Sequence, residues 1–90
     1  MYLAKVVGNV WSTRKEEGLR GLKFLAVQPV GLELEPYGPI VIAADRIGAG
    51  EGEIVMVVGG SSARQGFEAR NLPIDAVVVG IIDAETFQRN

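Results

Sequence analysis

One stretch of the sequence decides between an enzyme and a small barrel. It is Ile54-Val55-Met56-Val57-Val58, followed by Gly59-Gly60-Ser61-Ser62-Ala63-Arg64. The five apolar residues are typical of a β-strand covered on both faces, and the glycines mark a turn after it. The spacing Gly59-x-Ser61-x-Ala63 nearly matches the nucleophile elbow, which presents a serine oxygen at a strand end. The serine could therefore be a nucleophile, part of a phosphate cradle or only a turn residue.

The amino-acid composition argues against catalysis, because the chain has no histidine and no cysteine. These absences remove the usual general base, the usual zinc ligand, disulfides and a thiol nucleophile. A Ser-His-Asp arrangement cannot form even between copies, and no S-x-x-K spacing supports a serine–lysine pair. A helical turn over residues 61–66, with Ser61 or Ser62 as N-cap and Gly66 as its left-handed stop, explains the serines. We expect no enzyme, no metal and no organic cofactor.

Length and hydropathy predict one globular domain over residues 1–90. The 90 residues are 48% hydrophobic and 22% charged, which is typical of a folded chain rather than a disordered one. No apolar run approaches the ~20 residues that a membrane-spanning helix needs. The first residues, Met1 to Lys5, lack the pattern of a secretory signal, so a cytoplasmic location is expected.

Five strands are expected, each bounded by Gly, Pro or Asp. In the first of them, alternation places Ala4, Val6, Gly8 and Val10 on an inward face. Short strands without long helices predict an all-β fold, a small five-stranded antiparallel barrel of the oligonucleotide-binding (OB) type with one short helical turn. The expected strands are residues 3–12, 22–28, 40–44, 53–58 and 74–82.

The third, fourth and fifth strands are apolar on both faces, which a small monomeric barrel in water would not be. If about five large aliphatic side chains per copy point outward and become buried, they contribute on the order of 10 kcal/mol before association costs. Residues 1–28 carry five basic and two acidic side chains (+3), whereas residues 29–90 carry four and nine (−5). We therefore expect an obligate homo-oligomer with complementary surfaces.

The segment from Asp45 to Glu53 contains glycines at alternate positions, Gly48, Gly50 and Gly52. Such glycines can expose N–H groups to an anion, but a dinucleotide site needs a helix afterwards, and here a strand is expected. A tight glycine-dependent loop is the favoured interpretation. Its small residues, Gly48 and Gly50 among them, could let two backbones approach closely at a subunit interface.

Three carboxylates, Asp45, Asp75 and Asp83, end or interrupt apolar strands. Acid–base catalysis by a pair of them would need a cleft deeper than a barrel of this size can build. Pairing with arginine is the favoured interpretation. Asp75 and Arg64 are the expected partners, placed at a subunit interface, where such a pair fixes register more than it adds stability.

An OB-type barrel also raises the possibility of nucleic-acid binding. Single-strand binders combine a basic groove with aromatic stacking platforms. This chain is acidic overall, its aromatic residues are scattered, and the basic loop residues Arg14 and Lys15 are few. A small oligomeric barrel that binds single-stranded nucleic acid is therefore kept only as the alternative, and no nucleic-acid partner is expected.

Six segments in order carry a family resemblance, and they span residues 3–83. The sequence resembles the EutN/CcmL type of bacterial microcompartment vertex protein, found in carboxysomes and in metabolosomes of the ethanolamine and propanediol type. The matching segments are Leu3-Ala4-Lys5-Val6-Val7-Gly8, Ser12-Thr13-Arg14-Lys15, Leu19-x-Gly21-Leu22-Lys23, Asp45-x-x-Gly48-Ala49-Gly50-x-Gly52-Glu53, Gly60-Ser61-Ser62-Ala63-Arg64 and Pro73-x-Asp75-Ala76 running to Asp83.

The resemblance implies a structural protein without catalysis. Family members of this kind are five-stranded barrels that form homopentameric rings and cap the vertices of a shell tiled by hexameric shell proteins in the bacterial cytoplasm. Within such a ring we expect the small residues Ser61, Ser62 and Ala63 near the axis, beside the pore. A ring of six is the alternative that the sequence leaves open, and residues 31–37 are where this chain departs from the family's pattern.

Overall fold

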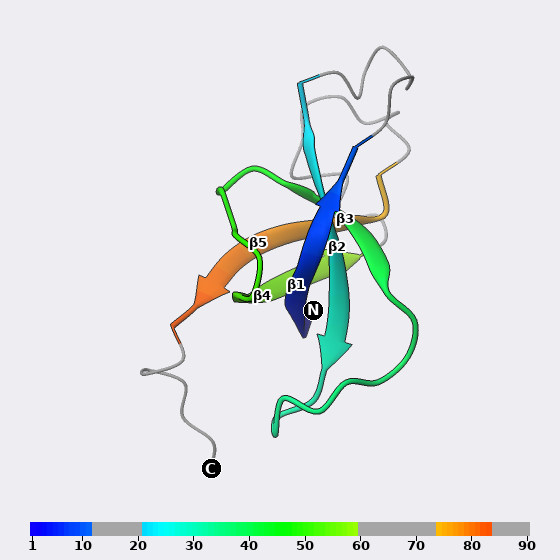
Figure 1. Ribbon diagram of the computed structural model, residues 1–90, viewed down its shortest axis with the longest axis vertical. Coiled ribbons are helices and arrows are strands. Elements are labelled where there is room, and N and C mark those ends of the chain that lie inside the picture. The colour runs from blue at the N-terminus through cyan, green and yellow to red at the C-terminus, as the bar shows by residue number, and fades with distance from the viewer. Residues whose placement is uncertain (12–20, 60–73, 84–90) are drawn as a thin grey trace.

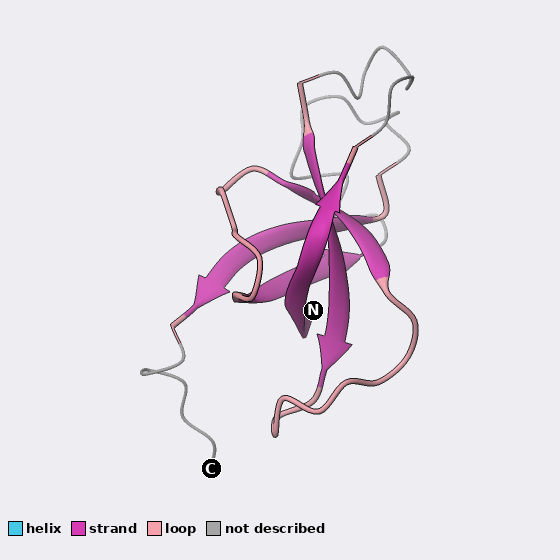
Figure 2. Ribbon diagram, in the orientation of Figure 1, coloured by secondary structure: helices cyan, strands magenta, loops and turns pink. Residues whose placement is uncertain are grey.

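The computed structural model describes residues 1–11, 21–59 and 74–83, and it contains five β-strands closed into a barrel (Figures 1 and 2). The all-β fold is confirmed, and each strand end lies within two residues of its expected position. No part of the described chain forms a helix that could cross a membrane. The helical turn expected at residues 61–66 lies outside the described residues. The strands are β1 (Tyr2–Val10), β2 (Lys23–Val30), β3 (Val41–Asp45), β4 (Ile54–Gly59) and β5 (Ala76–Ile82).

The barrel closes in the order β1-β2-β3-β5-β4, and one of its seams is parallel. At that seam β3 pairs with β5 through Ala44↔Val77 and Asp45↔Val78, whereas the other four seams are antiparallel. The expected five-stranded antiparallel barrel is therefore confirmed except at this one seam. Strand directions cannot alternate all the way round a closed ring with an odd number of members, so a five-stranded barrel needs at least one parallel pair.

The interior is filled by aliphatic side chains from alternate positions of the strands, as the period of two predicts. The largest of these side chains keep almost no exposed surface. In β1 the inward positions Ala4 and Val6 are confirmed. The largest fully buried side chains are Leu25, Val6, Val27, Val55, Val57 and Val78.

A β-bulge in β1 changes the face on which its second half lies. The register shifts between Val6 and Gly8, and beyond the shift Gly8 pairs with Ala26. Leu25 and Val27, on either side of Ala26, point into the barrel, so Ala26 and its partner Gly8 lie outside. Val10, two residues after Gly8, lies outside too. The prediction that Gly8 and Val10 point inward was wrong because a bulge inserts one residue into the alternation.

Strand β2 continues through Pro29, where the sequence predicted a loop. The Pro29 carbonyl accepts a hydrogen bond from the Tyr37 amide at 3.0 Å, so this edge of the residue faces the following loop rather than β1. A proline is tolerated here because the sheet needs no N–H on that edge. The Gln28 amide group donates to the carbonyls of Tyr37 and Gly38 at 3.0 and 3.2 Å and holds the loop against the strand.

Candidate functional site

The loop between β3 and β4, residues 46–53, is organised by the buried carboxylate of Asp45, which is only 4% exposed. This carboxylate accepts hydrogen bonds from the backbone amides of Ile47, Gly48 and Ala49 at 3.0, 3.2 and 2.8 Å. Lys23 Nζ lies 3.8 Å from Asp45 Oδ2 and donates to the Ala49 carbonyl at 3.1 Å. A buried charge is stable only when it is paired and hydrogen-bonded in this way.

These contacts exclude an anion cradle in the loop. The amides that the glycines would offer to a phosphate are already bonded within the chain. Gly48 donates to the Asp45 carboxylate, Gly50 to the Glu53 carboxylate and Gly52 to the Val6 carbonyl. The structure thus favours a tight loop that depends on its glycines. At Gly48 the φ angle is +82°, a value that glycine adopts readily. The partners of Asp45 include backbone amides and a lysine, where the sequence suggested an arginine.

Of the other residues that the sequence singled out, Asp75 lies exposed just before β5. Burial, and then the neighbouring Tyr37 and Asp75, raise the pKa of the Tyr2 hydroxyl. Ser61, Ser62, Ala63 and Arg64 lie outside the described residues. Gly48 and Gly50 are exposed, and their role at an interface stays a prediction, as does that of Asp75. Within the described chain, no cluster of acidic side chains could hold a metal ion.

The outer surface of the barrel carries two apolar faces. The first, here called the β1–β2–β3 face, consists of Gly8, Val10, Ala26 and Ile42. The register joins them in neighbouring rows, since Gly8 pairs with Ala26 and Ala26 with Ile42. Ile42 is 47% exposed although it lies in the middle of a strand. An antiparallel sheet that faced water would carry polar side chains at such positions.

The second, here called the β4–β5 face, consists of Ile54, Met56, Gly80 and Ile82. Val55 and Val57 point into the barrel, so Ile54 and Met56 point out of it. They pair with Ile82 and Gly80 respectively, and all four are partly exposed. In the closed ring of strands, β2 is separated from β4 and β5 by one strand on each side. The two apolar faces therefore lie on opposite sides of the barrel.

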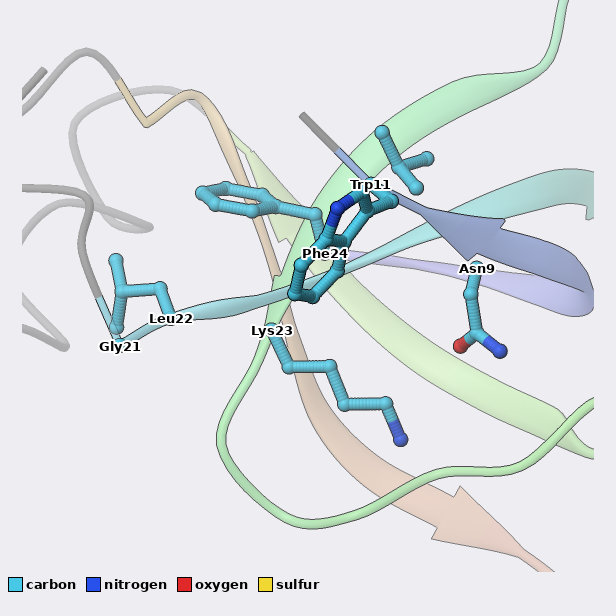
Figure 3. Close-up of a pocket in the computed structure, with 7 residues that line it drawn as sticks. Asn9, Trp11, Gly21, Leu22, Lys23 and Phe24 are labelled. Atoms are coloured by element: carbon cyan, nitrogen blue, oxygen red, sulfur yellow. The ribbon is translucent and has the colours of Figure 1, made fainter. Parts of the chain in front are cut away.

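A groove of about 510 Å³ extends from the β1–β2–β3 face between the end of β1 and the start of β2 (Figure 3). Val10, Trp11, Leu22 and Phe24 give it an apolar lining, with Lys23 directed away from the two aromatic rings. Trp11 is 87% exposed. An exposed tryptophan beside an apolar groove is typical of a surface that binds another protein.

Comparison with known proteins identifies the family. The model of the family described as "Ethanolamine utilisation protein EutN/carboxysome" matches residues 1–83. The chain belongs to this family. Among its relatives is the bacterial microcompartment shell vertex protein GrpN of Rhodospirillum rubrum, 51% identical over 92% of this chain and 93% of that protein. The carboxysome shell vertex protein CcmL of Thermosynechococcus vestitus is 47% identical over 92% of this chain and 84% of that protein.

Solved structures of the EutN/carboxysome family include rings of five. The pentameric shell protein GrpN from R. rubrum has a TM-score of 0.83, with 50% identity over 93% of this chain and 95% of that one. The pentameric shell protein MSM0273 from the RMM microcompartment has a TM-score of 0.82, with 40% identity over 100% and 99%. Family membership confirms the resemblance seen in the sequence, and relatives that are shell proteins agree with the expectation of no catalysis.

The sequence analysis identified the apolar character of the strands but missed which residues form the outer faces. The bulge in β1 hid Gly8, which was assigned to the interior. A glycine in the middle of a strand was nevertheless a usable signal, because it often marks a bulge or the close approach of another backbone. Trp11 was noted only as one of several scattered aromatic residues, since the groove exists only once β1 and β2 are paired.

Proposed function

We propose that this chain is a structural shell protein whose copies form a homopentameric ring that caps the vertices of a bacterial microcompartment. The observation that carries the proposal is the agreement between its relatives and its surface. Relatives over nine-tenths of the chain are shell vertex proteins, and structural neighbours are pentameric. A ring buries two surfaces of every copy, and the barrel has two apolar faces on opposite sides.

The function is geometric rather than chemical. A flat layer of hexagonal tiles cannot close into a polyhedron, and five-membered units at the vertices supply the missing curvature. Hexameric shell proteins of the same compartment are the partners that we expect at the edges of the ring. The whole segment 1–90 acts as one vertex-type barrel domain, located in a shell within the bacterial cytoplasm. We expect no binding of single-stranded nucleic acid, which a titration at low salt would test.

Co-expression with a hexameric microcompartment shell protein tests the capping role. With the chain present, electron microscopy should show closed polyhedral shells with five copies at each vertex. Without it, the same hexamers should give sheets, tubes or shells with open vertices. Closed shells that form equally well without the chain, or that exclude it, would contradict the proposal.

A further inference from the structure

We infer that the β4–β5 face of one copy packs on the β1–β2–β3 face and the adjoining Trp11 groove of the next copy. This inference rests on the proposed ring, and it names the two surfaces from which the ring is built. The occupant of the groove is thus a second copy of this chain.

The placement of the two faces fits a head-to-tail contact. A closed ring of identical subunits uses two different patches on each subunit, whereas a two-fold dimer uses one patch twice. Here β2, the central strand of the first face, is separated from β4 and β5 by one strand on each side of the barrel. Each face is continuous across paired strands, through Gly8, Ala26 and Ile42 on one side and through Ile54 and Ile82 on the other.

Gly8 gives an independent indication that another backbone lies on the β1–β2–β3 face. Its φ is not in the left-handed region, so the local conformation does not require glycine. A Cβ built on Gly8 would meet no other part of the described chain within 4 Å. The fold of one copy therefore has room for a side chain here. A glycine at such a place is explained if a neighbouring copy approaches closely.

Charge also favours this pairing over contacts between two like faces. Lys23 lines the groove, and it belongs to residues 1–28, which carry a net charge of +3. A second hollow, of about 410 Å³, adjoins the β4–β5 face and is lined by Ile54 and Ile82 together with Glu53 and Asp83. Docking this face on the groove brings these acidic side chains toward Lys23, which is about half exposed although it also lies 3.8 Å from Asp45.

Two complementary variants test the inference by native mass spectrometry. Ile42→Glu places a charge on the β1–β2–β3 face and leaves the β4–β5 face intact, and Met56→Glu does the reverse. Each variant alone should lose the ring and run as a 9.6 kDa monomer. An equimolar mixture should form a 1:1 heterodimer, because one intact copy of each face remains. Circular dichroism checks that each variant is folded, and the heterodimer itself would require two folded chains.

The outcomes separate this inference from the proposed function. Leu32→Glu, at an exposed loop position outside both faces, is the matched control and should keep the wild-type ring. If the wild-type chain forms a pentamer and both face variants still do, the named surfaces are wrong while the ring stands. If the variants are monomers that fail to bind each other, the head-to-tail pairing is wrong. If the wild-type chain is itself a folded monomer, the proposed function fails first.

Gly8→Val supplies a second test that does not depend on inserting a charge. Valine suits a strand, and its side chain has room on the outside of a single barrel, so the fold should be retained. The ring should dissociate at a protein concentration at least tenfold higher than for the wild type, as measured by sedimentation. Val7→Ala, at the adjacent exposed position of β1, is the matched control for a substitution in this strand. An unchanged ring in Gly8→Val would contradict the close approach at this face.

Discussion

The inside and the outside of the barrel differ in exposure far more than in composition. Val27 and Val57 inside have no exposed surface, whereas Ile42 and Val79 on the outside keep 47% and 43% of theirs. The interior is complete within one copy of the chain. The outside uses side chains of the same kind, and each large aliphatic residue buried there would contribute about 1.5 to 3 kcal/mol. One copy of the chain is therefore sufficient for the fold, but it leaves the apolar side chains on the outside of the barrel exposed.

Truncating an interior side chain should give the largest effect. Leu25→Ala removes a side chain with no exposed surface and should lower the free energy of unfolding by about 2 to 5 kcal/mol, because a cavity is left. Denaturant unfolding should show this loss at every protein concentration. The matched outer variant, Ile42→Ala, should instead weaken association, so its ring should dissociate at a higher protein concentration while the folded single chain loses less stability than in Leu25→Ala. Equal behaviour of the two variants would remove the distinction between inside and outside.

The interior was the part of the fold that the sequence predicted best. Alternation along the strands gave Ala4 and Val6 their correct face, and glycines, prolines and aspartates set the strand ends to within two residues. The bulge after Val6 could not be read from the alternation of apolar residues, and its one sign in the sequence was the glycine at position 8. A closed barrel with an odd number of strands requires at least one parallel pair. Which pair is parallel, here β3 and β5 at Ala44, depends on how the strands are arranged in space.

The candidate site was predictable in part. The glycines after Asp45 indicated a tight loop, and the structure explains that loop by hydrogen bonds to a single carboxylate. The outer faces were not predictable residue by residue, because they depend on register. Ile42 and Ala26, for instance, become neighbours only when β2 and β3 are paired.

The β3–β4 loop can be tested as a second interior feature. Asp45→Ala leaves three backbone amides and Lys23 without their acceptor, and it should cost about 3 kcal/mol of unfolding free energy. Asp45→Asn keeps one oxygen acceptor and should cost less. Glu51→Ala, at an exposed position in the same loop, should change stability by no more than about 0.5 kcal/mol. If Asp45→Ala unfolded at the same denaturant concentration as the wild type, the carboxylate would not hold the loop.

The ion pair that the sequence predicts between Arg64 and Asp75, at a subunit interface, is tested by reversing the charges. Arg64→Glu should lower the melting temperature of the ring, because it places two acidic groups together at an interface. The double reversal Arg64→Glu/Asp75→Lys should recover much of the loss, whereas Asp75→Lys alone should not. Additive losses in the double variant, measured by differential scanning calorimetry, would show that the two residues do not interact.

The smallest effect is expected from Tyr2, which lies partly exposed on β1. Burial raises the pKa of its hydroxyl, with Tyr37 and Asp75 adding to the shift. The unfolded chain therefore loses this proton at a lower pH than the folded chain, so stability falls as the pH rises above about 10. Unfolding midpoints at pH 9 and 11 should fall further in the wild type than in Tyr2→Phe. If the unfolding midpoints of the wild type and Tyr2→Phe fell by the same amount between pH 9 and 11, the Tyr2 hydroxyl would not contribute to the pH dependence of stability.

Sedimentation of the wild-type chain on dilution through the micromolar range tests the central claim most directly, namely that identical copies cover the apolar outside of the barrel. We predict a single species of five times the 9.6 kDa chain that persists on dilution through this range. A well-folded, stable monomer at micromolar concentration would contradict the account.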